Sequence, residues 1–487
     1  MGSVRILDCT LRDGGCVIDF NFGDKNIDKI LDSLEQSSID MIECGYIDSN
    51  GSERERTKYR SDLVLDGILC KRSASEKYYV AMIDYGKFDV NTLAESDRSS
   101  ISGIRLAFHK ENAKEAIEYG KIILEKGYDL FVQPMVTLRY SDKELIELID
   151  SVNNELPSAK AFYIVDSFGE MRMKDVSRIF SIIDHNLSDS IYIGFHSHNN
   201  LQLSYPNAVE LLNGLDVLKR DLIIDSSVMG MGKGAGNLNT EIILEHLNMF
   251  YGKHYNISPI LHVIDNVILQ IYEDYRWGYS VEFFLSSSAH CSPSYASYYF
   301  NKHTLSIDQL KKLLLRIEPN KRNSFDKEYA EKLYETFNRD NSVRDDDTLN
   351  FLKKEITGKK LILIAPGKHL VDTMEDLKKM ACDRDNYVLM SLNAPNIVNS
   401  QFALVTKNEV ERDVPISEYV CERIIRTSNV EQYSSDDLVI NYNSWVNLGE
   451  NNGDSSVVIA LNLLEQIGSK EVYLAGFDGF STNIDEN

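Results

Sequence analysis

Several features of common protein classes are missing from this 487-residue sequence. No apolar run reaches the ~18–20 residues that a membrane span requires, and the N-terminal MGSVRILDCT lacks the long apolar stretch of a signal peptide. The seven cysteines are odd in number and scattered, with no Cys-x-x-Cys pair. This usage favours reduced thiols and argues against a disulfide framework or a structural zinc site. We therefore expect a cytoplasmic protein without a membrane partner.

Positive charge is also scarce. Lys and Arg total 52 against 75 Asp and Glu, which gives a formal net charge of −23. Because contacts to phosphate need clustered Lys and Arg, this balance argues against nucleic acid as a general partner. Hydrophobic residues make up 43% of the chain, enough to build a core, so global disorder is excluded.

The first 254 residues alternate between short apolar runs and segments with helical periodicity. Eight strands are expected, at Val4–Cys9, Met41–Cys44, Tyr78–Met82, Ile101–Ala107, Leu130–Met135, Ala161–Val165, Ile191–Phe195 and Leu222–Val228. Eight strand–helix units at a spacing of ~30 residues predict an α/β fold of the (β/α)8 TIM barrel type. An open doubly wound sheet is the alternative. The barrel is favoured because the polar motifs follow the first, seventh and eighth strands, which only closure brings together.

Two further segments follow this barrel. Residues 255–340 are expected to form a helical extension, and Asp340–Asp347 is a polar stretch suited to a linker. Residues 341–487 show a second α/β pattern, with strand-like runs LILIAPG, YVLMSLN, FALVTK, DLVINYN and EVYLAGFDG. We interpret this part as a smaller Rossmann-like domain.

Three polar motifs follow the expected strands and suggest a metal site. DCTLRDGG places Arg12 beside Asp13, HSHNN carries His196 and His198, and GMGKGAGN ends at Asn237. Histidines at i and i+2 of an extended chain point to the same side, so both imidazoles can meet one ion. The alternatives are a strand-capping turn with a surface ion pair for the first motif and a flexible or phosphate-binding loop for the third.

One Asp oxygen and two His nitrogens leave open positions on an octahedral ion. This ligand set favours Mn²⁺ or Mg²⁺, with Co²⁺ and Zn²⁺ as alternatives. Glu43 and Asp166 end the second and sixth expected strands and should face the same mouth. For Glu43 we favour a role in orienting Arg12.

These motifs together resemble a known group of enzymes. LDCTLRDGG, IEC at 42–44, VDSFGEM at 165–171, GFHSHNN at 194–200 and GMGKGAGN at 230–237 are similar, in this order, to segments of the DRE-TIM metallolyase superfamily. That group includes 3-hydroxy-3-methylglutaryl-CoA lyase, 2-isopropylmalate synthase and 4-hydroxy-2-oxovalerate aldolase. VDSFGEM and GMGKGAGN look most like the aldolase branch.

The resemblance implies roles for individual residues. Asp13, His196 and His198 would hold a divalent metal, most simply Mn²⁺, with Asn237 as a further ligand. The metal would chelate pyruvate or another 2-oxo acid, and Arg12 would stabilise its enolate during an aldol or retro-aldol step with an aldehyde. The resemblance also favours a homodimer.

One position departs from the aldolase pattern. Those aldolases carry a histidine three residues after Arg-Asp that acts as the base, and here the position is Cys16. A buried thiol is a poorer base. We therefore treat Cys16 as a candidate, with Tyr295, His290, Asp19 or a metal-bound water as alternatives. The change also suggests a different aldehyde from the short aliphatic ones.

The C-terminal domain resembles bacterial sialyltransferase-like and pterin-pyrophosphokinase-like Rossmann domains in two short segments. That resemblance would place Gly367 and Asp478 near a nucleotide or nucleotide-sugar and would link the protein to the biosynthesis of an unusual sugar or surface polysaccharide. A degenerate docking domain is the alternative, because neither GxGxxG nor a P-loop is present.

Three other functions are compatible with a barrel of this kind. An acyl-CoA-dependent lyase or condensing synthase is disfavoured because Lys233-Gly234 stand where the acyl-CoA lyases carry a Cys-bearing loop. A biotin-dependent carboxyltransferase would need a lysine at a strand end, where the sixth strand offers Asp166-Ser167. A non-catalytic binding protein that retains the fold would not need the metal ligands.

Overall fold

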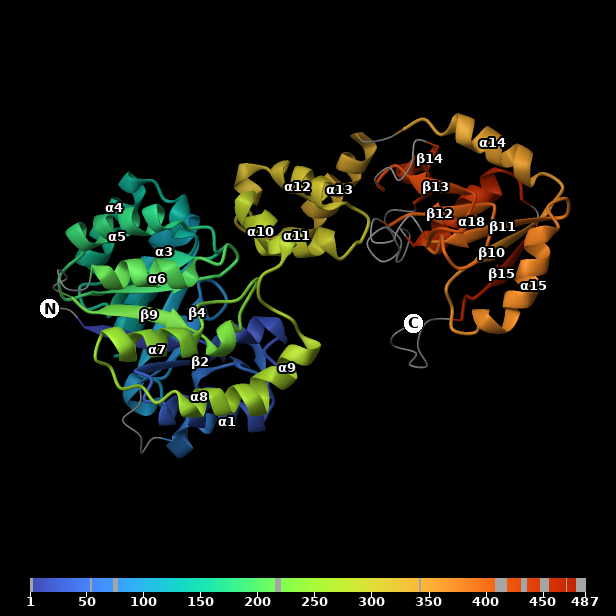
Figure 1. The fold of residues 1–487 in the computed structure, drawn as a ribbon. Coiled ribbons are helices and arrows are strands. Elements are labelled where there is room, and N and C mark those ends of the chain that lie inside the picture. Colours follow the sequence, from blue (N-terminus) through green and yellow to red (C-terminus); the bar gives the residue numbers. More distant parts are fainter. Residues whose placement is uncertain are drawn as a thin grey trace. The chain divides into compact units, whose positions relative to one another are not determined.

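The computed structural model describes residues 3–52, 55–72, 78–214, 220–340, 343–407, 418–430, 436–446, 455–469 and 471–478. The chain divides into two compact units, Met1–Pro293 and Ser294–Asn487 (Figure 1). The predicted linker Asp340–Asp347 includes residues 341–342, which lie outside the described residues. Among the helices of the described residues, none is long and apolar enough to cross a membrane.

The first unit contains a closed barrel of eight parallel strands, so the predicted barrel is confirmed. The strands are β1 (Val4–Asp8), β2 (Met41–Ser52), β4 (Tyr78–Asp84), β5 (Gly103–Phe108), β6 (Asp129–Pro134), β7 (Ala161–Asp166), β8 (Tyr192–Ser197) and β9 (Leu222–Ser226). Each pairs with its neighbours in chain order, and β1 closes the ring by pairing with both β9 and β2. The two-residue strand β3 (Lys58–Tyr59) extends the sheet beside β2.

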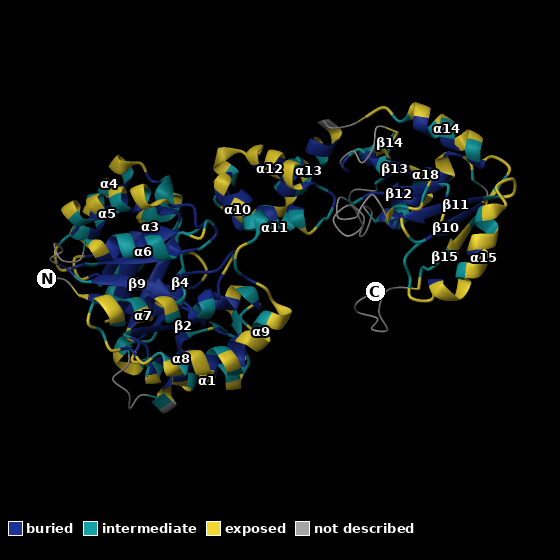
Figure 2. Ribbon diagram, in the orientation of Figure 1, coloured by how far each residue is buried: buried dark blue, intermediate teal, exposed yellow. Residues whose placement is uncertain are grey.

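Helices form the outer layer of the barrel (Figure 2). They are α1 (Asp24–Gln36), α2 (Asp62–Leu69), α3 (Ala113–Glu125), α4 (Asp142–Glu155), α5 (Met173–Asn186), α6 (Ser204–Asn213) and α7 (Thr240–Phe250). Their apolar stripes explain this arrangement: α1 buries Ile27, Ile30, Leu31 and Leu34 on one side. The connection from β4 to β5 contains only the short 3-10 helices Val90–Thr92 and Ser96–Arg98.

Alternation along the strands creates two separate cores. Ile6 and Ile224 pack against the helices, whereas Leu7 and Ile223 belong to a smaller apolar cluster inside the barrel. Polar side chains that alternate in step with Leu7 and Ile223 therefore also point into the barrel, and those near the carboxyl ends of the strands line its mouth. In barrels of this type, that end carries the functional residues.

The first unit continues with helices after the barrel. These are α8 (Ser258–Val263), a π-helical turn η9 (Ile264–Ile268), α9 (Leu269–Asp274) and α10 (Val281–Ser288). The segment that contains α8 and η9 packs along α1. Tyr255, just before α8, donates its hydroxyl hydrogen bond to Asp40 at 2.5 Å.

The second unit begins with helices and continues as a parallel sheet with its own core. The helices are α11 (Pro293–Phe300), α12 (Ile307–Leu315), α13 (Lys327–Asp340), α14 (Asp346–Ile356), α15 (Leu370–Cys382), α17 (Tyr442–Trp445) and α18 (Ser456–Gln466). The strands are β10 (Lys360–Ile364), β11 (Tyr387–Leu392), β12 (Phe402–Val405), β13 (Arg423–Thr427), β14 (Leu438–Ile440) and β15 (Val472–Ala475), in the order β14-β13-β12-β11-β10-β15. The predicted α/β architecture of this part is confirmed, and β13 is a strand that the prediction missed.

Candidate metal centre at the barrel mouth

The ends of β1 and β8 bring three predicted ligands together. Asp13 lies in the turn after β1, His196 is on β8, and His198 follows that strand directly. One ligand atom from each of the three lies within 4.8 Å of the others, and all three residues are buried. Since β1, β9 and β8 are adjacent in the closed barrel, closure itself produces this cluster.

Both imidazoles are oriented by a hydrogen bond from the protein. His196 Nδ1 lies 2.9 Å from Asp225 Oδ2, and His198 Nδ1 lies 3.1 Å from the carbonyl oxygen of Lys233. Because Nδ1 donates in each case, Nε2 of each ring carries a lone pair when that ring is neutral. The two Nε2 atoms lie 3.5 and 3.6 Å from Asp13 Oδ2. Fixing the tautomer through the remote nitrogen is how proteins orient histidine ligands of metals.

Two buried oxygen atoms at this point lack a partner within the described residues. Asp13 Oδ2 and Asn237 Oδ1 are inaccessible to solvent and accept no hydrogen bond. Asn237 forms an isolated bridge with His198 and uses its Nδ2 to contact Cys9 Sγ at 3.7 Å. Orphaned buried oxygens beside two imidazole lone pairs are unfavourable without a cation. The donor set therefore fits a divalent metal.

The charges of the cluster suit a metal as well. Burial opposes ionisation of Asp13, but Arg12 and the two imidazoles hold the pKa of its carboxyl well below the usual range. Burial lowers the pKa of His198 to about 4, which keeps the imidazole neutral. For His196, burial is outweighed by contacts with Asp13 and Asp225, which raise its pKa. At neutral pH the site offers one carboxylate and at least one neutral imidazole.

Arg12 extends into the site from the same turn as Asp13. Its Nε donates to Glu43 Oε2 at 2.8 Å, and its NH1 lies 3.2 Å from Asp13 Oδ1. Its NH2 is buried and makes no hydrogen bond within the described part of the chain. The guanidinium is thus fixed by two carboxylates and retains one N–H group for a ligand. Glu43 is placed where it orients Arg12.

A buried network behind Arg12 was not anticipated from the sequence. Arg105 on β5 is fully buried and joins Glu43, at 2.7 Å, to Asp225, which also accepts a hydrogen bond from Tyr163 at 3.1 Å. A continuous chain of contacts therefore runs from Arg12 through Glu43, Arg105 and Asp225 to His196. The available signal was a charge inside each of two apolar strand runs, IRLAF and LIIDS. A buried charge must be paired.

The remaining candidates at the mouth have other contacts. Cys16 reaches the solvent, with Sγ 3.9 Å from Asp13 Oδ1. Surrounding protein atoms and the Asp13 carboxylate raise the pKa of this thiol to about 12, which does not suit a base near neutral pH. The Asp166 carboxylate accepts hydrogen bonds from the backbone N–H groups of Glu170 and Met171 and so stabilises the turn that follows β7. Asp19 is exposed and pairs with Arg56.

Tyr295 belongs to the second unit and is fully buried there. Its hydroxyl donates to the carbonyl oxygen of Lys321 at 3.1 Å and accepts from the backbone N–H of Asp326 at 3.2 Å. Its ring also packs against Phe325, with centroids 5.0 Å apart. The hydroxyl is thus used both as a hydrogen-bond donor and as an acceptor within the second unit, so we do not assign Tyr295 a part in the chemistry.

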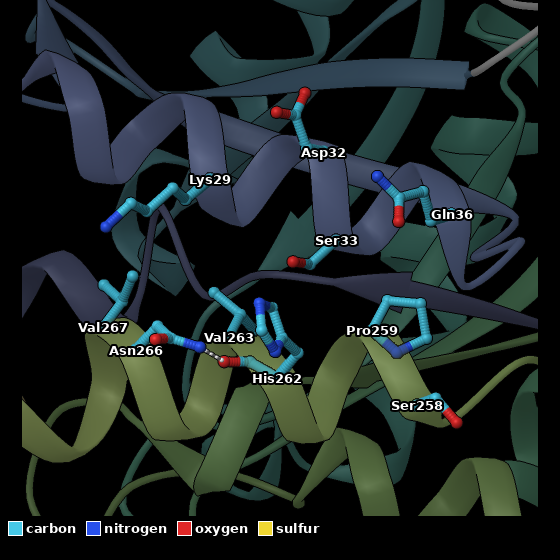
Figure 3. A pocket seen from close by; sticks show the side chains of 10 residues that line it. All are labelled: Lys29, Asp32, Ser33, Gln36, Ser258, Pro259, His262, Val263, Asn266 and Val267. Carbon is cyan, nitrogen blue, oxygen red and sulfur yellow. Dashed lines mark hydrogen bonds between the residues drawn. The ribbon is translucent and has the colours of Figure 1, made fainter.

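A separate groove lies on the outer helices of the barrel (Figure 3). It has a volume of about 610 Å³ and is lined by side chains of α1 and the α8–η9 segment: Lys29, Asp32, Ser33, Gln36, Ser258, Pro259, His262, Val263, Asn266 and Val267. The hydrogen bond drawn there joins Asn266 Nδ2 to the carbonyl oxygen of His262. No member of the metal cluster lines this groove, and we give it no catalytic role.

The predicted nucleotide position in the second unit is occupied by protein. Asp478 follows β15, and its Oδ2 accepts the backbone N–H of His369 at 2.9 Å, at the start of α15. A Cβ atom on Gly367 would lie 2.2 Å from Asp478 Oδ1. The carboxylate thus sits where a phosphate at this helix N-terminus would lie.

Comparison with known proteins is consistent with the geometry of the barrel. The family model described as HMGL-like matches residues 3–265. The chain belongs to the HMGL-like family. A 4-hydroxy-2-oxovalerate aldolase of Geobacillus genomosp. 3 is 28% identical to this HMGL-like protein over 249 residues, which are 50% of this chain and 71% of the relative. The enzyme of the same name from Chloroflexus aggregans is 27% identical over 245 residues, 50% of this chain and 68% of the relative.

Solved structures share the architecture. The N-terminal domain of a candidate aldolase from Bacteroides vulgatus is 26% identical to this HMGL-like protein, with a TM-score of 0.52, over 61% of this chain and 96% of that domain. The carboxyl transferase domain of Rhizobium etli pyruvate carboxylase gives a TM-score of 0.53 at 13% identity, over 72% of this chain and 64% of that one. The second likeness concerns the fold alone.

Proposed function

We propose that this HMGL-like protein is a divalent-metal-dependent pyruvate aldolase, which forms or cleaves the bond between the methyl carbon of pyruvate and an aldehyde carbon. The main support for this proposal is the buried set of Asp13, His196 and His198 beside the guanidinium of Arg12. The names of its relatives support this reaction class. Mn²⁺ is the expected ion, since a mixed oxygen and nitrogen set with open positions suits it.

One group of residues would hold the metal, and Arg12 would stabilise the enolate. When bound, the cation supplies Lewis-acid polarisation of the 2-oxo group. The hydrogen bonds that His196 and His198 donate to Asp225 and to the Lys233 carbonyl keep both rings in the tautomer that offers Nε2. Arg12, held by Glu43, directs its free NH2 group toward the charge that develops as the enolate forms. Residues 1–254 would form the TIM-barrel domain that holds the metal and the enolate.

A panel experiment tests the proposal. Purified protein with Mn²⁺ is incubated with pyruvate and a range of sugar-derived and simple aldehydes, and in the reverse direction with 4-hydroxy-2-oxo acids, beginning with 4-hydroxy-2-oxovalerate. We expect condensation or pyruvate release that requires the metal and is lost in His196→Ala. Turnover of acetyl-CoA without any pyruvate chemistry would favour the acyl-CoA-dependent alternative. Residues 255–340 are proposed as a helical extension of the barrel, and residues 341–487 as a separate Rossmann-like domain.

A further inference from the structure

A second imidazole–carboxylate pair lies outside the metal cluster. Glu170, whose side chain is 1% exposed, accepts a hydrogen bond from His290 Nδ1 at 2.5 Å through Oε2. Its Oε1 lies 2.6 Å from Arg139 NH2, as an ion pair without well-directed hydrogen-bond geometry. Arg139 also donates to the carbonyl oxygen of His290 at 3.2 Å. A buried carboxylate thus holds a histidine whose own side chain is 56% exposed.

This pair is built on the loop that contacts the metal ligands. Glu170 belongs to the turn after β7, and the backbone N–H of His198 donates to the carbonyl oxygen of Asp166 at the start of that turn, at 3.2 Å. Gly169 has a φ of +56°, and a Cβ atom there would lie 2.7 Å from the carbonyl oxygen of His198. The turn is therefore packed directly on the end of β8 that presents both histidine ligands.

His290 reaches this turn from a separate segment of the first unit. Ser287, in α10, donates its hydroxyl hydrogen bond to the carbonyl oxygen of Phe168 at 2.6 Å, which fixes α10 over the carboxyl end of β7. His290 itself has a φ of +56°, a left-handed conformation that non-glycine residues adopt infrequently. Backbone strain of this kind is concentrated at functional sites. Within the described residues, nothing hydrogen-bonds its Nε2, which leaves that nitrogen free for a ligand.

We propose that His290, positioned by Glu170, is the catalytic acid–base that exchanges a proton with the C4 hydroxyl of the aldol. This inference rests on the proposed function and adds the residue that acts on the aldehyde half of the substrate. In cleavage, Nε2 takes the proton from the hydroxyl, and the electrons of the O–H bond form the aldehyde carbonyl. The electrons of the C3–C4 bond form the C2–C3 double bond as the π electrons of the 2-oxo group move to its oxygen, which gives the pyruvate enolate. Water then donates a proton to C3, and the imidazolium releases its proton to the solvent. Condensation is the reverse.

The carboxylate and the guanidinium explain how such a histidine would work. A carboxylate on Nδ1 fixes the tautomer, so that Nε2 is the accepting atom, and it stabilises the imidazolium that forms. Arg139 balances the charge of Glu170 and holds the histidine backbone in place. The arrangement supplies the proton acceptor that the exposed thiol of Cys16 does not.

The test compares two reactions that share the enolate. Retro-aldol cleavage requires removal of a hydroxyl proton, whereas decarboxylation of oxaloacetate yields the same enolate without one. We expect His290→Asn, whose side chain tolerates the left-handed backbone, to lower the ratio of cleavage rate to decarboxylation rate by about 10²-fold or more. His303→Asn is the matched control, because His303 has a φ of +55° in the second unit. It should leave the ratio unchanged.

Two further measurements separate catalysis from support of the fold. His290→Gly keeps the backbone conformation and leaves room for free imidazole, which should restore cleavage in a saturable manner. Glu170→Gln, which retains the size of the side chain, should lower kcat for cleavage by about tenfold with little change in KM, since Glu170 acts through His290. If cleavage and decarboxylation fall together in His290→Asn and imidazole restores neither, His290 only braces α10 and the proposal is overturned.

Failure of the proposed function gives a different result. In that case the wild-type protein with Mn²⁺ would neither cleave any 4-hydroxy-2-oxo acid nor decarboxylate oxaloacetate. A wild type that carries out both reactions, together with a His290→Asn variant of normal cleavage-to-decarboxylation ratio, would leave the aldolase proposal intact and reject the role of His290.

Discussion

The two imidazoles of the candidate metal centre each use one ring nitrogen to bind the protein, which leaves the other for an ion. For His196 the protein partner is the buried carboxylate of Asp225, which itself is held by Arg105 and Tyr163. At the proposed metal centre, the affinity for an ion would therefore depend on residues that do not touch the ion. Outer contacts of this kind contribute 10–100-fold to metal affinity.

Replacing Asp225 by Asn tests this dependence. We expect Asp225→Asn to weaken Mn²⁺ binding by about 10–100-fold, because the amide no longer fixes the charge and tautomer of His196. Titration calorimetry measures the change. The matched control is Asp221→Asn, on the residue just before β9, where the carboxylate pairs with Arg5 at 2.9 Å on the opposite end of the barrel. Equal affinities in the two variants would show that Asp225 does not support the site.

Metal binding should also depend on pH through a single histidine. Contacts with Asp13 and Asp225 raise the pKa of His196 above its ordinary value despite burial, whereas burial lowers the pKa of His198 to about 4. Because a ligand must be deprotonated, Mn²⁺ affinity should fall as the pH drops below the raised pKa of His196, by up to about tenfold per pH unit. Titrations between about pH 5.5 and 8 measure the slope. A slope of two protons per ion would contradict the assignment.

Arg12 is predicted to act on the transition state and not on metal binding. Arg12→Lys keeps a cation beside Glu43 and Asp13 but loses the fixed fork whose NH2 group is free. We expect the kcat/KM of the aldol reaction to fall about 10²–10³-fold while Mn²⁺ affinity changes only slightly. The control is Arg56→Lys, the same substitution at an arginine that forms an exposed ion pair with Asp19. A loss confined to KM would mean that Arg12 only binds substrate.

The glycine-rich segment after β9 carries Asn237 and the carbonyl oxygen that orients His198. Within it, Gly236 has a φ of +81°, and a Cβ atom there would lie 2.0 Å from the carbonyl oxygen of Gly230. The sequence GMGKGAGN is thus required by the close approach of the loop to itself. The position of the loop after β9 thus determines how His198, at the end of the neighbouring strand β8, is oriented.

Gly236→Ala should displace this loop. We expect the variant to be destabilised by more than the ~1 kcal/mol that a left-handed conformation costs alanine, and to bind Mn²⁺ more weakly. Gly252→Ala is the matched control, since Gly252 has a φ of +63° with no atom within 4 Å of the added Cβ. Chemical denaturation gives both free energies of unfolding. Equal losses of stability would show that the close approach to Gly230 is not rigid.

The strands were predictable where their apolar runs were unbroken. The expected run Ile191–Phe195 falls short of β8, Tyr192–Ser197, because the strand continues into His196, whose polar side chain is accommodated in the barrel interior. β13 was missed because Arg423 and Arg426 leave only two isoleucines together. The sequence pattern therefore predicts strands that are apolar on both faces and fails where charged or polar side chains interrupt the apolar run.

The convergence of the three candidate ligands was predictable for a different reason. His196 and His198 share one side of a strand by local geometry alone, and barrel closure brings Asp13 to them. Arg105 and Asp225 were missed because their pairing links strands that are 120 residues apart in sequence. A charge inside each apolar run indicates that a buried partner is needed, but the local sequence does not show which strand supplies it.

The chain as a whole consists of two units, each with its own core. All residues of the proposed metal centre, together with Arg12, Glu170 and His290, lie in the first unit. The chain carries a net charge of −23, whereas the proposed substrate, pyruvate, is an anion, so its attraction would have to be local and come from the metal and Arg12. The N-terminal domain from Bacteroides vulgatus, solved alone, has the same barrel.

A fragment of residues 1–293 should therefore fold and bind one Mn²⁺ with the affinity of the full chain. Circular dichroism and calorimetry on the fragment and the full chain provide the comparison. A fragment that does not fold, or that folds and binds no metal, would show that the second unit completes the site.

Exchange of the pyruvate methyl protons with D₂O reports on enolate formation alone, because it requires the metal centre and Arg12 but no aldehyde. Proton NMR of pyruvate with the Mn²⁺-loaded full chain should show loss of the methyl signal, and the exchange should stop on chelation and fall at least 10²-fold in Asp13→Asn. Exchange that proceeds equally in the chelated protein and in Asp13→Asn, or no exchange in the loaded wild type, would show that the protein is not a metal-dependent pyruvate aldolase.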